Sequence, residues 1–397
     1  MIKKWYNIKY LTDGINMENW KYRILTFIRY LGDSFYYPFV ALYLNSRHLT
    51  ESKIGLIIGI SPLVGIILNP FFTYLCKNFK KTKTLLSFIS IFEALAIVAI
   101  AFSSSFPLIV ISSIMIAIFG ACHYGLMDSV LTIYAENAKI SYSTIRVMGS
   151  IAYIIGTLVG GILIKQTNYQ LTFIIASALF IASGLFYYLL TPIEDVKSSE
   201  KVRFFAVFKN RQYLPYLLVF VLFMAICFSS DHFFSLFLKA KGLDESAYGF
   251  VYSYYVLIET ITLLVLARFK GKLNGDWMIL IAIVAMLIRH LVNFFDLNVY
   301  VIIVASGLRG LSVGIFFYAA YTYFLKLLGA NLTTKGIMIA NFGQLLGIFL
   351  MDDLNGLIIE KWGFQIFYLL VIILTFMLLS LQLVRMIVRR KENKLYI

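Results

Sequence analysis

Eleven ionisable side chains stand inside strongly apolar stretches of this sequence, where a charge is costly unless it has a partner or a function. A buried carboxyl group can exchange protons, and a guanidinium group can bind a carboxylate or phosphate through two hydrogen bonds. The chemistry that these residues suggest is therefore ion pairing, proton exchange and binding of a polar solute within a membrane. The eleven residues are Arg29, Asp33, Glu93, Asp128, Arg146, Asp231, Glu259, Arg289, Arg309, Asp352 and Asp353.

The first apolar stretch carries three of the candidate site residues on one helical face. Arg29, Asp33 and Tyr36 are spaced i, i+4 and i+7, so a helix places them in one row. Arg29 and Asp33 could neutralise each other within that helix, or the face could line a solute cavity. We expect Asp33 and Tyr36 to contact the solute if the second alternative holds.

A second polar stripe predicts the site of proton exchange. Tyr252, Tyr255, Glu259 and Thr262 share one helical face, and such a face seldom points into lipid. We expect Tyr255 to contact the solute and Glu259 to exchange the proton. Arg289 either tunes Glu259 or simply pairs with it across two helices. Burial can make a carboxyl group of this kind titratable.

Asp128 and Arg146 form the sharpest pair of candidates. Asp128 lies about six residues before the end of one expected helix, and Arg146 about three residues after the next one begins. At 1.5 Å per residue their depths differ by only ~5 Å, which an arginine side chain can span. We expect the two residues to contact the solute, or to form a pair that shapes its site.

The composition requires a membrane around these residues. Sixty per cent of the 397 residues are hydrophobic and 14% are charged, more apolar surface than a soluble domain of this length can bury. A transmembrane helix needs about 20 apolar residues, so we predict an all-α protein with twelve transmembrane helices. The expected helices are 20–44, 54–75, 84–105, 107–134, 143–165, 169–190, 213–238, 248–267, 277–295, 300–325, 336–357 and 364–388.

The distribution of positive charge predicts the orientation. If the N-terminus is cytoplasmic, 25 of the 35 Lys and Arg residues lie in the cytoplasmic loops and tails, and six lie on the opposite side. This pattern follows the positive-inside rule, so we expect both termini in the cytoplasm and the protein in the inner (cytoplasmic) membrane. The net charge of +15 is thereby explained without nucleic acid, and we expect no nucleic-acid partner.

An internal repeat divides the chain into two similar halves. The segment 49–56 (LTESKIGL) matches 243–250 (LDESAYGF) at an offset of 194 residues, and an offset of 195 carries Gly161 onto Gly356. With six helices per half, the two copies are parallel repeats, as in major facilitator transporters. We predict an N-terminal half at 1–190, a cytoplasmic linker at 191–212 and a C-terminal half at 213–397.

Several segments resemble the oligosaccharide:proton symporters, with lactose permease the best-known member, and related nucleoside and aromatic-acid permeases of the major facilitator superfamily. These segments are 146–153 (RVMGSIAY) with an acid 18 residues upstream, 38–44 (PFVALYL), 54–65 (IGLIIGISPLVG) and 287–290 (LIRH). In that group the helix 4 carboxylate and helix 5 arginine pair and hold sugar hydroxyls, which implies this role for Asp128 and Arg146. The resemblance also places the family's helix 8 acid at Glu259 and its helix 9 arginine at Arg289.

Two segments depart from the family pattern. The usual helix 2–3 loop motif has lost its Gly and Asp in 73–82 (TYLCKNFKKT), and helix 10 carries Arg309 and Ser312 where the lactose permease has His and Glu. An arginine stays charged, so it cannot relay protons as those residues do. Either the proton is carried by Glu259 or by another acid such as Asp231, Asp352 or Asp353, or Arg289 and Arg309 form a permanent positive patch that selects an anionic solute.

Secondary active transport by alternating access is the function that these observations favour. We expect helices 1, 4, 5, 7, 8 and 10 to line a central site for a sugar or glycoside, a nucleoside or an aromatic acid, with a proton as coupling ion. We expect a monomer in contact with lipid, with no cofactor and no metal. The sequence holds no motif of an intramembrane enzyme or an ATPase. A drug or metabolite efflux antiporter and a non-transporting sensor of the same fold are the alternatives.

Overall fold

The computed structural model describes residues 17–76, 79–121, 123–191, 204–269 and 273–395, and every regular element in these ranges is a helix. The elements are α2 (Met17–Tyr36), η1 (Tyr37–Phe39), α3 (Val40–Ser46), α4 (Glu51–Leu75), α5 (Phe79–Phe102), α6 (Phe106–Gly120), α7 (His123–Asn137), α8 (Tyr142–Gln166), α9 (Tyr169–Leu189), η2 (Phe204–Lys209), α10 (Tyr213–Ala240), α11 (Glu245–Ala267), α12 (Gly275–Phe294) and α13 (Val299–Leu395). Of the predicted linker at 191–212, residues 192–203 lie outside the described residues, and its second part contains η2.

Local sequence sets several of the helix boundaries. Asn168, Asp244 and Asn274 each stand at a helix N-cap, where the side-chain oxygen accepts a hydrogen bond from a backbone N–H of the first turn. Pro38 lies in the 3₁₀ turn η1, which interrupts the first transmembrane segment between α2 and α3. These signals explain why the observed boundaries lie close to those expected from the apolar runs.

Helix α13 contains three transmembrane segments. Its backbone leaves helical geometry at Gly329 and Gly363, where φ is 68° and 78°, values that glycine adopts without steric cost. The described residues contain ten helices long and apolar enough to cross a membrane, and one of these, Leu332–Arg389, includes the break at Gly363. Dividing it there and adding the more polar segment α2–α3 gives the twelve transmembrane helices that the sequence predicted.

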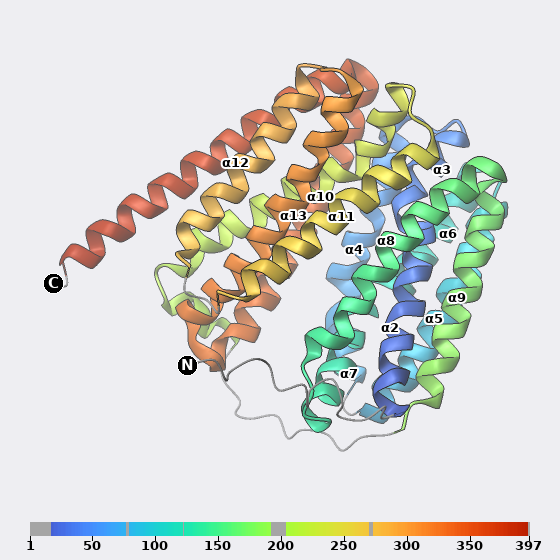
Figure 1. The fold of residues 1–397 in the computed structure, drawn as a ribbon, viewed down its shortest axis with the longest axis horizontal. Coiled ribbons are helices and arrows are strands. Elements are labelled where there is room, and N and C mark those ends of the chain that lie inside the picture. Colours follow the sequence, from blue (N-terminus) through green and yellow to red (C-terminus); the bar gives the residue numbers. More distant parts are fainter. Residues whose placement is uncertain (1–16, 77–78, 122, 192–203, 270–272, 396–397) are drawn as a thin grey trace, which may run out of the picture.

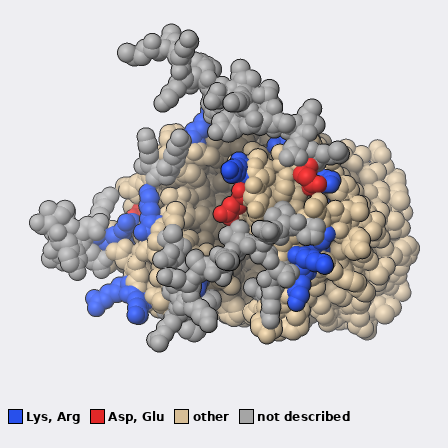
Figure 2. Space-filling view, turned by 90° about the horizontal axis from the view of Figure 1, so that it is seen from below, with Lys and Arg blue, Asp and Glu red and all other residues tan. Residues whose placement is uncertain are grey.

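The helices form two groups that meet at one end of the molecule (Figure 1). One group runs from α2 to α9 and the other from α10 to α13, and they diverge toward the end where α2 begins and α13 finishes, called the terminal side here. Viewed from that side, the surface is hollowed near its centre, with acidic and basic side chains beside the hollow (Figure 2). The surface of the protein is therefore open on the terminal side, where the two groups diverge.

Four glycines make the contact between the groups at the opposite side. A Cβ atom added to Gly161 would lie 2.4 Å from the carbonyl oxygen of Glu245, and one added to Gly249 would lie 2.4 Å from that of Thr157. The same occurs where α4 crosses α13, since Gly55 faces the Asp352 carbonyl at 2.4 Å and Gly356 faces the Glu51 carbonyl at 2.5 Å. Only glycine allows backbones to approach so closely.

These glycines occupy equivalent positions in the two repeats. Gly55 corresponds to Gly249 at the offset of 194 residues, and Gly161 corresponds to Gly356 at 195. The α4–α13 and α8–α11 crossings are thus two copies of one contact, in agreement with a fold of two parallel six-helix repeats.

Polar side chains join the two groups beside the glycine crossings. Nζ of Lys165 lies 2.7 Å from a carboxylate oxygen of Asp244, and the Tyr169 hydroxyl donates to Glu245 at 2.8 Å. Hydrogen bonds from Lys165 and from the Ala247 N–H lower the pKa of Asp244, because both stabilise the charged carboxylate. The Lys165–Asp244 pair therefore remains ionised at neutral pH and is lost only as the pH falls through that lowered value.

Candidate functional site

A cavity of about 440 Å³ lies between the two groups of helices. It is lined by the predicted helices 1, 4, 5, 7, 8 and 10, and helices 2 and 11 contribute as well through α4 and the middle part of α13. Binding sites for small molecules have volumes of about 300–1,000 Å³, so this cavity is large enough for a small solute.

Tyrosines from both groups dominate the polar surface of the cavity. An aromatic ring offers an apolar face, and its hydroxyl group offers a donor and an acceptor, a combination suited to a ring-shaped polar solute. Tyr252 stands at the centre of this array, because its ring centroid lies 4.6 Å from that of Tyr255 and 6.0 Å from that of Tyr153. The seven tyrosines are Tyr36, Tyr37, Tyr124, Tyr153, Tyr248, Tyr252 and Tyr255.

Four charged residues form a connected network in the C-terminal group, called the C-terminal cluster here. Asp231 on α10 accepts from Nη1 of Arg289 at 2.6 Å and from Nε of Arg309 at 2.7 Å, and Arg309 also donates to Glu259. The network joins α10, α11, α12 and α13. Two guanidinium groups face two carboxylates, so the C-terminal cluster is neutral when all four side chains are ionised.

The C-terminal cluster corrects one expected pairing. The sequence offered a direct contact between Arg289 and Glu259, but Arg289 binds Asp231 and Glu259 binds Arg309. The sequence offered Asp231 only as an alternative to Glu259 for proton coupling, whereas it lines the cavity and holds both arginines. Its only sequence signal was a carboxyl group in an apolar stretch, and that signal did not indicate a central position.

The predicted substrate residues divide into two sets. Tyr36, Tyr255 and Arg309 line the cavity, and the Arg309 guanidinium lies 4.7 Å from the centre of the Tyr255 ring. Asp33 does not line it and is completely buried. The remaining two, Asp128 and Arg146, are absent from the lining as well.

Asp128 and Arg146 do not form the expected ion pair in the described part of the chain. Asp128 instead accepts a hydrogen bond from the Tyr142 hydroxyl at 2.7 Å, and the Arg146 guanidinium lies over the Tyr30 ring at 4.3 Å. The depth estimate placed the two residues at similar levels, but it did not fix the rotation of either helix about its axis. Their role as substrate contacts stays a prediction.

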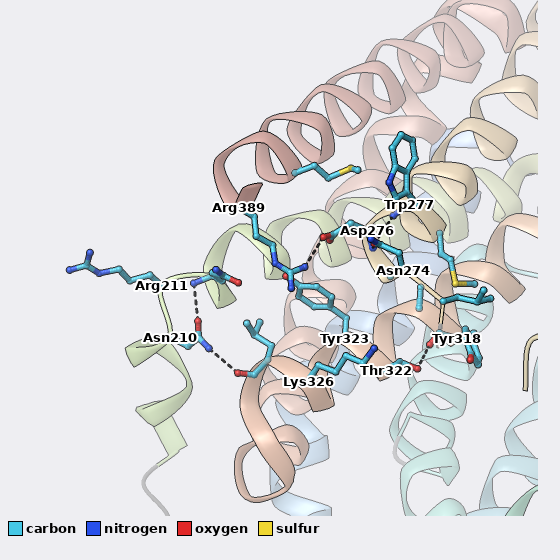
Figure 3. A pocket seen from close by; sticks show the side chains of 17 residues that line it. Asn210, Arg211, Asn274, Asp276, Trp277, Tyr318, Thr322, Tyr323, Lys326 and Arg389 are labelled. Carbon is cyan, nitrogen blue, oxygen red and sulfur yellow. Dashed lines mark hydrogen bonds and ion pairs between the residues drawn. The ribbon is translucent and has the colours of Figure 1, made fainter. Parts of the chain in front are cut away.

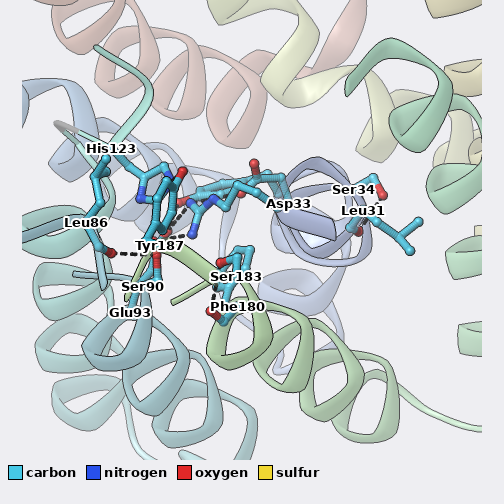
Figure 4. A network of polar contacts seen from close by, with 12 residues as sticks. Leu31, Asp33, Ser34, Leu86, Ser90, Glu93, His123, Phe180, Ser183 and Tyr187 are labelled. Carbon is cyan, nitrogen blue, oxygen red and sulfur yellow. Dashed lines mark hydrogen bonds and ion pairs between the residues drawn. The ribbon is translucent and has the colours of Figure 1, made fainter. Parts of the chain in front are cut away.

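A second charged network lies in the N-terminal group and is called the N-terminal cluster here (Figure 4). Arg29 donates two hydrogen bonds to Glu93, at 2.8 and 3.0 Å, and its Nη2 atom lies 3.0 Å from Asp33. All three side chains are fully buried. The pairing of Arg29 with Asp33 was one of the sequence alternatives, whereas Glu93 had no assigned role before the structure placed it here.

One more acid has a partner that the sequence did not indicate. Asp352 is fully buried, and its carboxylate lies 2.9 Å from Nδ1 of His232. His232 also lines the cavity. Asp353, its neighbour in the chain, is only half-buried.

A separate cavity of about 860 Å³ lies within the C-terminal group on the terminal side (Figure 3). Asp276 is held there by Arg385 and by Arg389, the latter at 2.6 Å. All the lining residues belong to 210–389, so this cavity does not lie between the two groups. A solute that crosses between the halves would not pass through it.

The described residues contain no group of three or more His, Cys, Asp or Glu side chains placed to hold a metal ion. The two cysteines that the structure describes, Cys76 and Cys227, are free thiols. The polar groups of the central cavity can therefore bind a solute through hydrogen bonds, ring contacts and the Asp231–Arg309 pair.

Known proteins with similar sequences are membrane transporters. The chain is 25% identical over 374 residues to the uncharacterized transporter YwbF of Bacillus subtilis (strain 168), covering 92% of this chain and 93% of the relative. It is 24% identical to the sucrose permease of Escherichia coli (89% and 90% covered) and 21% identical to the maltose permease of Geobacillus stearothermophilus (84% and 86% covered).

Solved structures show the same fold. The nucleoside transporter NupG superposes with a TM-score of 0.79 at 15% identity, covering 93% of this chain and 98% of NupG. A bacterial homolog of the human lysosomal transporter Spinster, solved in an inward-facing and unoccupied conformation, superposes with a TM-score of 0.73 at 13% identity (93% and 96% covered). Residues 19–370 match the MFS_1 like family. The chain belongs to this family and is a multi-pass membrane transporter with the major facilitator fold.

Proposed function

We propose that this transporter is a proton-coupled symporter for a small, ring-shaped polar solute such as a sugar or a nucleoside. The observation that carries the proposal is the cavity of about 440 Å³ shared by the two groups of helices, with seven tyrosines and the Asp231–Arg309 pair in its wall. The sucrose and maltose permeases among its relatives, and the fold shared with NupG, support this class of solute.

Transport would proceed by alternating access. The halves 1–190 and 213–397, joined by 191–212, rock about the central cavity as in other transporters built from repeats. The excess of Lys and Arg on the terminal side favours a cytoplasmic location for that side and for both termini, in the inner membrane. The glycine crossings then close the outward path, and the protein works as a monomer.

Uptake into liposomes containing the purified protein tests the function. Sucrose, maltose and uridine are offered separately under an imposed pH gradient that is acidic on the outside. We expect accumulation of at least one probe, abolished by an uncoupler. Uptake that an uncoupler leaves unchanged would contradict proton coupling, and accumulation driven only by the opposite gradient would indicate an efflux antiporter. A failure of all three probes would contradict the proposed solute class and favour a sensor.

Glu259 remains the proposed proton-exchanging group of the C-terminal cluster, in contact with Arg309 and connected to Arg289 through Arg309 and Asp231. The Glu259→Gln variant should lose uphill uptake of the accepted probe and keep counterflow exchange, because exchange requires no net movement of protons. Uphill uptake equal to that of the wild type would remove Glu259 from proton coupling.

The ring of Tyr252 should contribute to solute affinity. We expect Tyr252→Ala to raise KM about tenfold, since an aromatic contact contributes about 0.5–1.5 kcal/mol beyond its buried area. Tyr252→Phe keeps the ring and should have a smaller effect. Tyr300→Ala is the matched control, because Tyr300 is 75% exposed and is not one of the residues that line the cavity. Equal KM values for Tyr252→Ala and Tyr300→Ala would contradict a role of Tyr252 in binding.

A further inference from the structure

The two buried clusters differ in net charge. The C-terminal cluster balances two arginines with two carboxylates, whereas the N-terminal cluster has Arg29 alone against Asp33 and Glu93. With every side chain ionised, the N-terminal cluster carries one excess negative charge. All three of its side chains have an exposure of 0%, so water cannot stabilise that charge. An uncompensated charge at such depth is strongly unfavourable, and binding of one proton would remove it.

The hydrogen bonds indicate which carboxyl group takes the proton. Glu93 accepts from both terminal nitrogens of Arg29 and from the Tyr37 hydroxyl at 2.7 Å, so three donors stabilise its charged form. Asp33 has the ion pair with Arg29, but neither of its oxygens meets hydrogen-bond geometry with any residue that the structure describes. Asp33 is therefore the less stabilised carboxylate of the two.

Among the described residues, only Arg29 brings a positive charge within ion-pair distance of Asp33. Arg146, the other arginine of this half that stands inside an apolar stretch, packs on the Tyr30 ring, and the imidazole of His123 makes a hydrogen bond with Tyr187 at 3.1 Å. The charged and titratable groups that face Asp33 from α2, η1, α5, α7, α8 and α9 are Arg29, Tyr30, Tyr37, Glu93, Tyr124, Tyr153 and Tyr187.

A bound metal cation would not suit this cluster. Hard cations such as Ca²⁺ take six or more oxygen ligands. Both oxygens of Glu93 are already occupied by donors, and the Arg29 guanidinium stands between the two acids. A proton needs only one carboxylate oxygen, and the Asp33 oxygen outside the ion pair with Arg29 accepts no hydrogen bond from the described residues.

Two tyrosines connect the N-terminal cluster with the cavity. Tyr37 lines the cavity and donates to Glu93, and Tyr124 lines the cavity and faces Asp33. Gly120, which also lines the cavity, leaves room for the contact between Tyr37 and Glu93. A Cβ atom at this position would lie 2.7 Å from the Tyr37 hydroxyl and 2.8 Å from a Glu93 oxygen. A solute hydroxyl that binds the phenol of Tyr37 or Tyr124 would therefore affect the N-terminal cluster through that tyrosine.

We propose that Asp33 is a proton-binding site of the N-terminal half, separate from Glu259, in which Glu93 and Arg29 hold the proton on Asp33. Tyr37 and Tyr124 connect this site to the solute cavity. Its part in transport rests on the proposed symport, but proton binding itself can be measured without any solute. A result that contradicts proton binding by Asp33 is therefore distinguishable from a result that contradicts the proposed symport.

Infrared spectroscopy of the purified protein tests the site directly. Spectra are recorded across roughly pH 5 to pH 9, the interval that buried carboxyl groups can reach. We expect a carbonyl band of a protonated carboxyl group that disappears as the pH rises. The band should be absent in Asp33→Asn. It should also be lost in Glu93→Gln, where Arg29 and Asp33 alone make a neutral pair, and retained in Glu259→Gln.

Thermal unfolding provides a second measurement on the same variants. If the folded state holds a proton that the unfolded state releases, stability falls as the pH rises through this interval. This fall should be present in the wild type and in Glu259→Gln and reduced in Asp33→Asn. A carbonyl band that survives in Asp33→Asn or Glu93→Gln, or a band that persists at every pH, would overturn the proposal. Unchanged spectra on adding Na⁺ are expected, and a loss of the band with Na⁺ would overturn it as well.

Discussion

Replacing Asp231 with asparagine is expected to lower the free energy of unfolding by about 3–5 kcal/mol, the usual cost of removing one partner from a buried ion pair. Asp231 is the shared acceptor for Arg289 and Arg309, at 2.6 and 2.7 Å, and the three side chains are at most 10% exposed. Without its carboxylate, Glu259 still neutralises Arg309, but Arg289 is left buried and unpaired. Thermal unfolding of the purified variant, scanned at the same rate as the wild type, measures the loss.

Two further variants isolate the role of charge in this prediction. The double variant Asp231→Asn, Arg289→Gln restores neutrality, so we expect it to recover a large part of the lost stability. Asp353→Asn is the matched control, because Asp353 is a half-buried acid on α13 without an ion pair among the described residues, and its change should stay within about 0.5 kcal/mol. A double variant no more stable than Asp231→Asn would show that charge balance does not hold the C-terminal cluster together.

Substituting valine for Gly161 or Gly356 should open the side of the transporter that is closed here. Each new side chain would meet a backbone carbonyl across the interface, that of Glu245 for Gly161 and that of Glu51 for Gly356, and neither backbone can move away without separating the helices. Overpacking of this kind costs about 1–3 kcal/mol. Such a cost shifts the ratio of two conformations by about 5–150-fold, so the cavity should open to the opposite side and net uptake should fall.

Spin labels report this change without any solute. Exposed residues at the ends of two helices, Thr167 and Lys361, are replaced by cysteine in a background without the native cysteines. The distance between the labels should grow in Gly161→Val and Gly356→Val. It should not change in Gly125→Val, since no atom lies within 4 Å of the Cβ position at Gly125. Identical distance distributions in all three variants would show that the glycine crossings do not control closure.

The repeat makes these two predictions more informative together. Each half contributes one glycine to each of the two crossings. Gly55 and Gly356 meet the facing backbone where α4 crosses α13, and Gly161 and Gly249 do so where α8 crosses α11. The charged clusters do not follow the same symmetry, because the C-terminal cluster is balanced and the N-terminal cluster carries an extra carboxylate. The two halves therefore share the glycine crossings but differ in their buried charge.

Much of the architecture could be predicted from the sequence alone. Apolar runs of membrane length determine helices in lipid, where every backbone hydrogen bond must be made within the segment. The break at Gly363 and the cap at Asp244 follow from equally local preferences. The repeat offset already paired Gly161 with Gly356, and the structure shows that both lie at helix crossings.

The partners of the buried charges were decided by the tertiary structure. Sequence position fixes the depth of Glu259, Arg289 and Asp231, yet Arg289 binds Asp231 and not Glu259. Glu93 had no sequence partner, and it accepts two hydrogen bonds from Arg29 across 64 residues of chain. Depth along a helix is set locally, whereas the direction in which a side chain points depends on how that helix rotates and tilts against its neighbours. That packing is a property of all twelve helices together, so no single segment of sequence contains it.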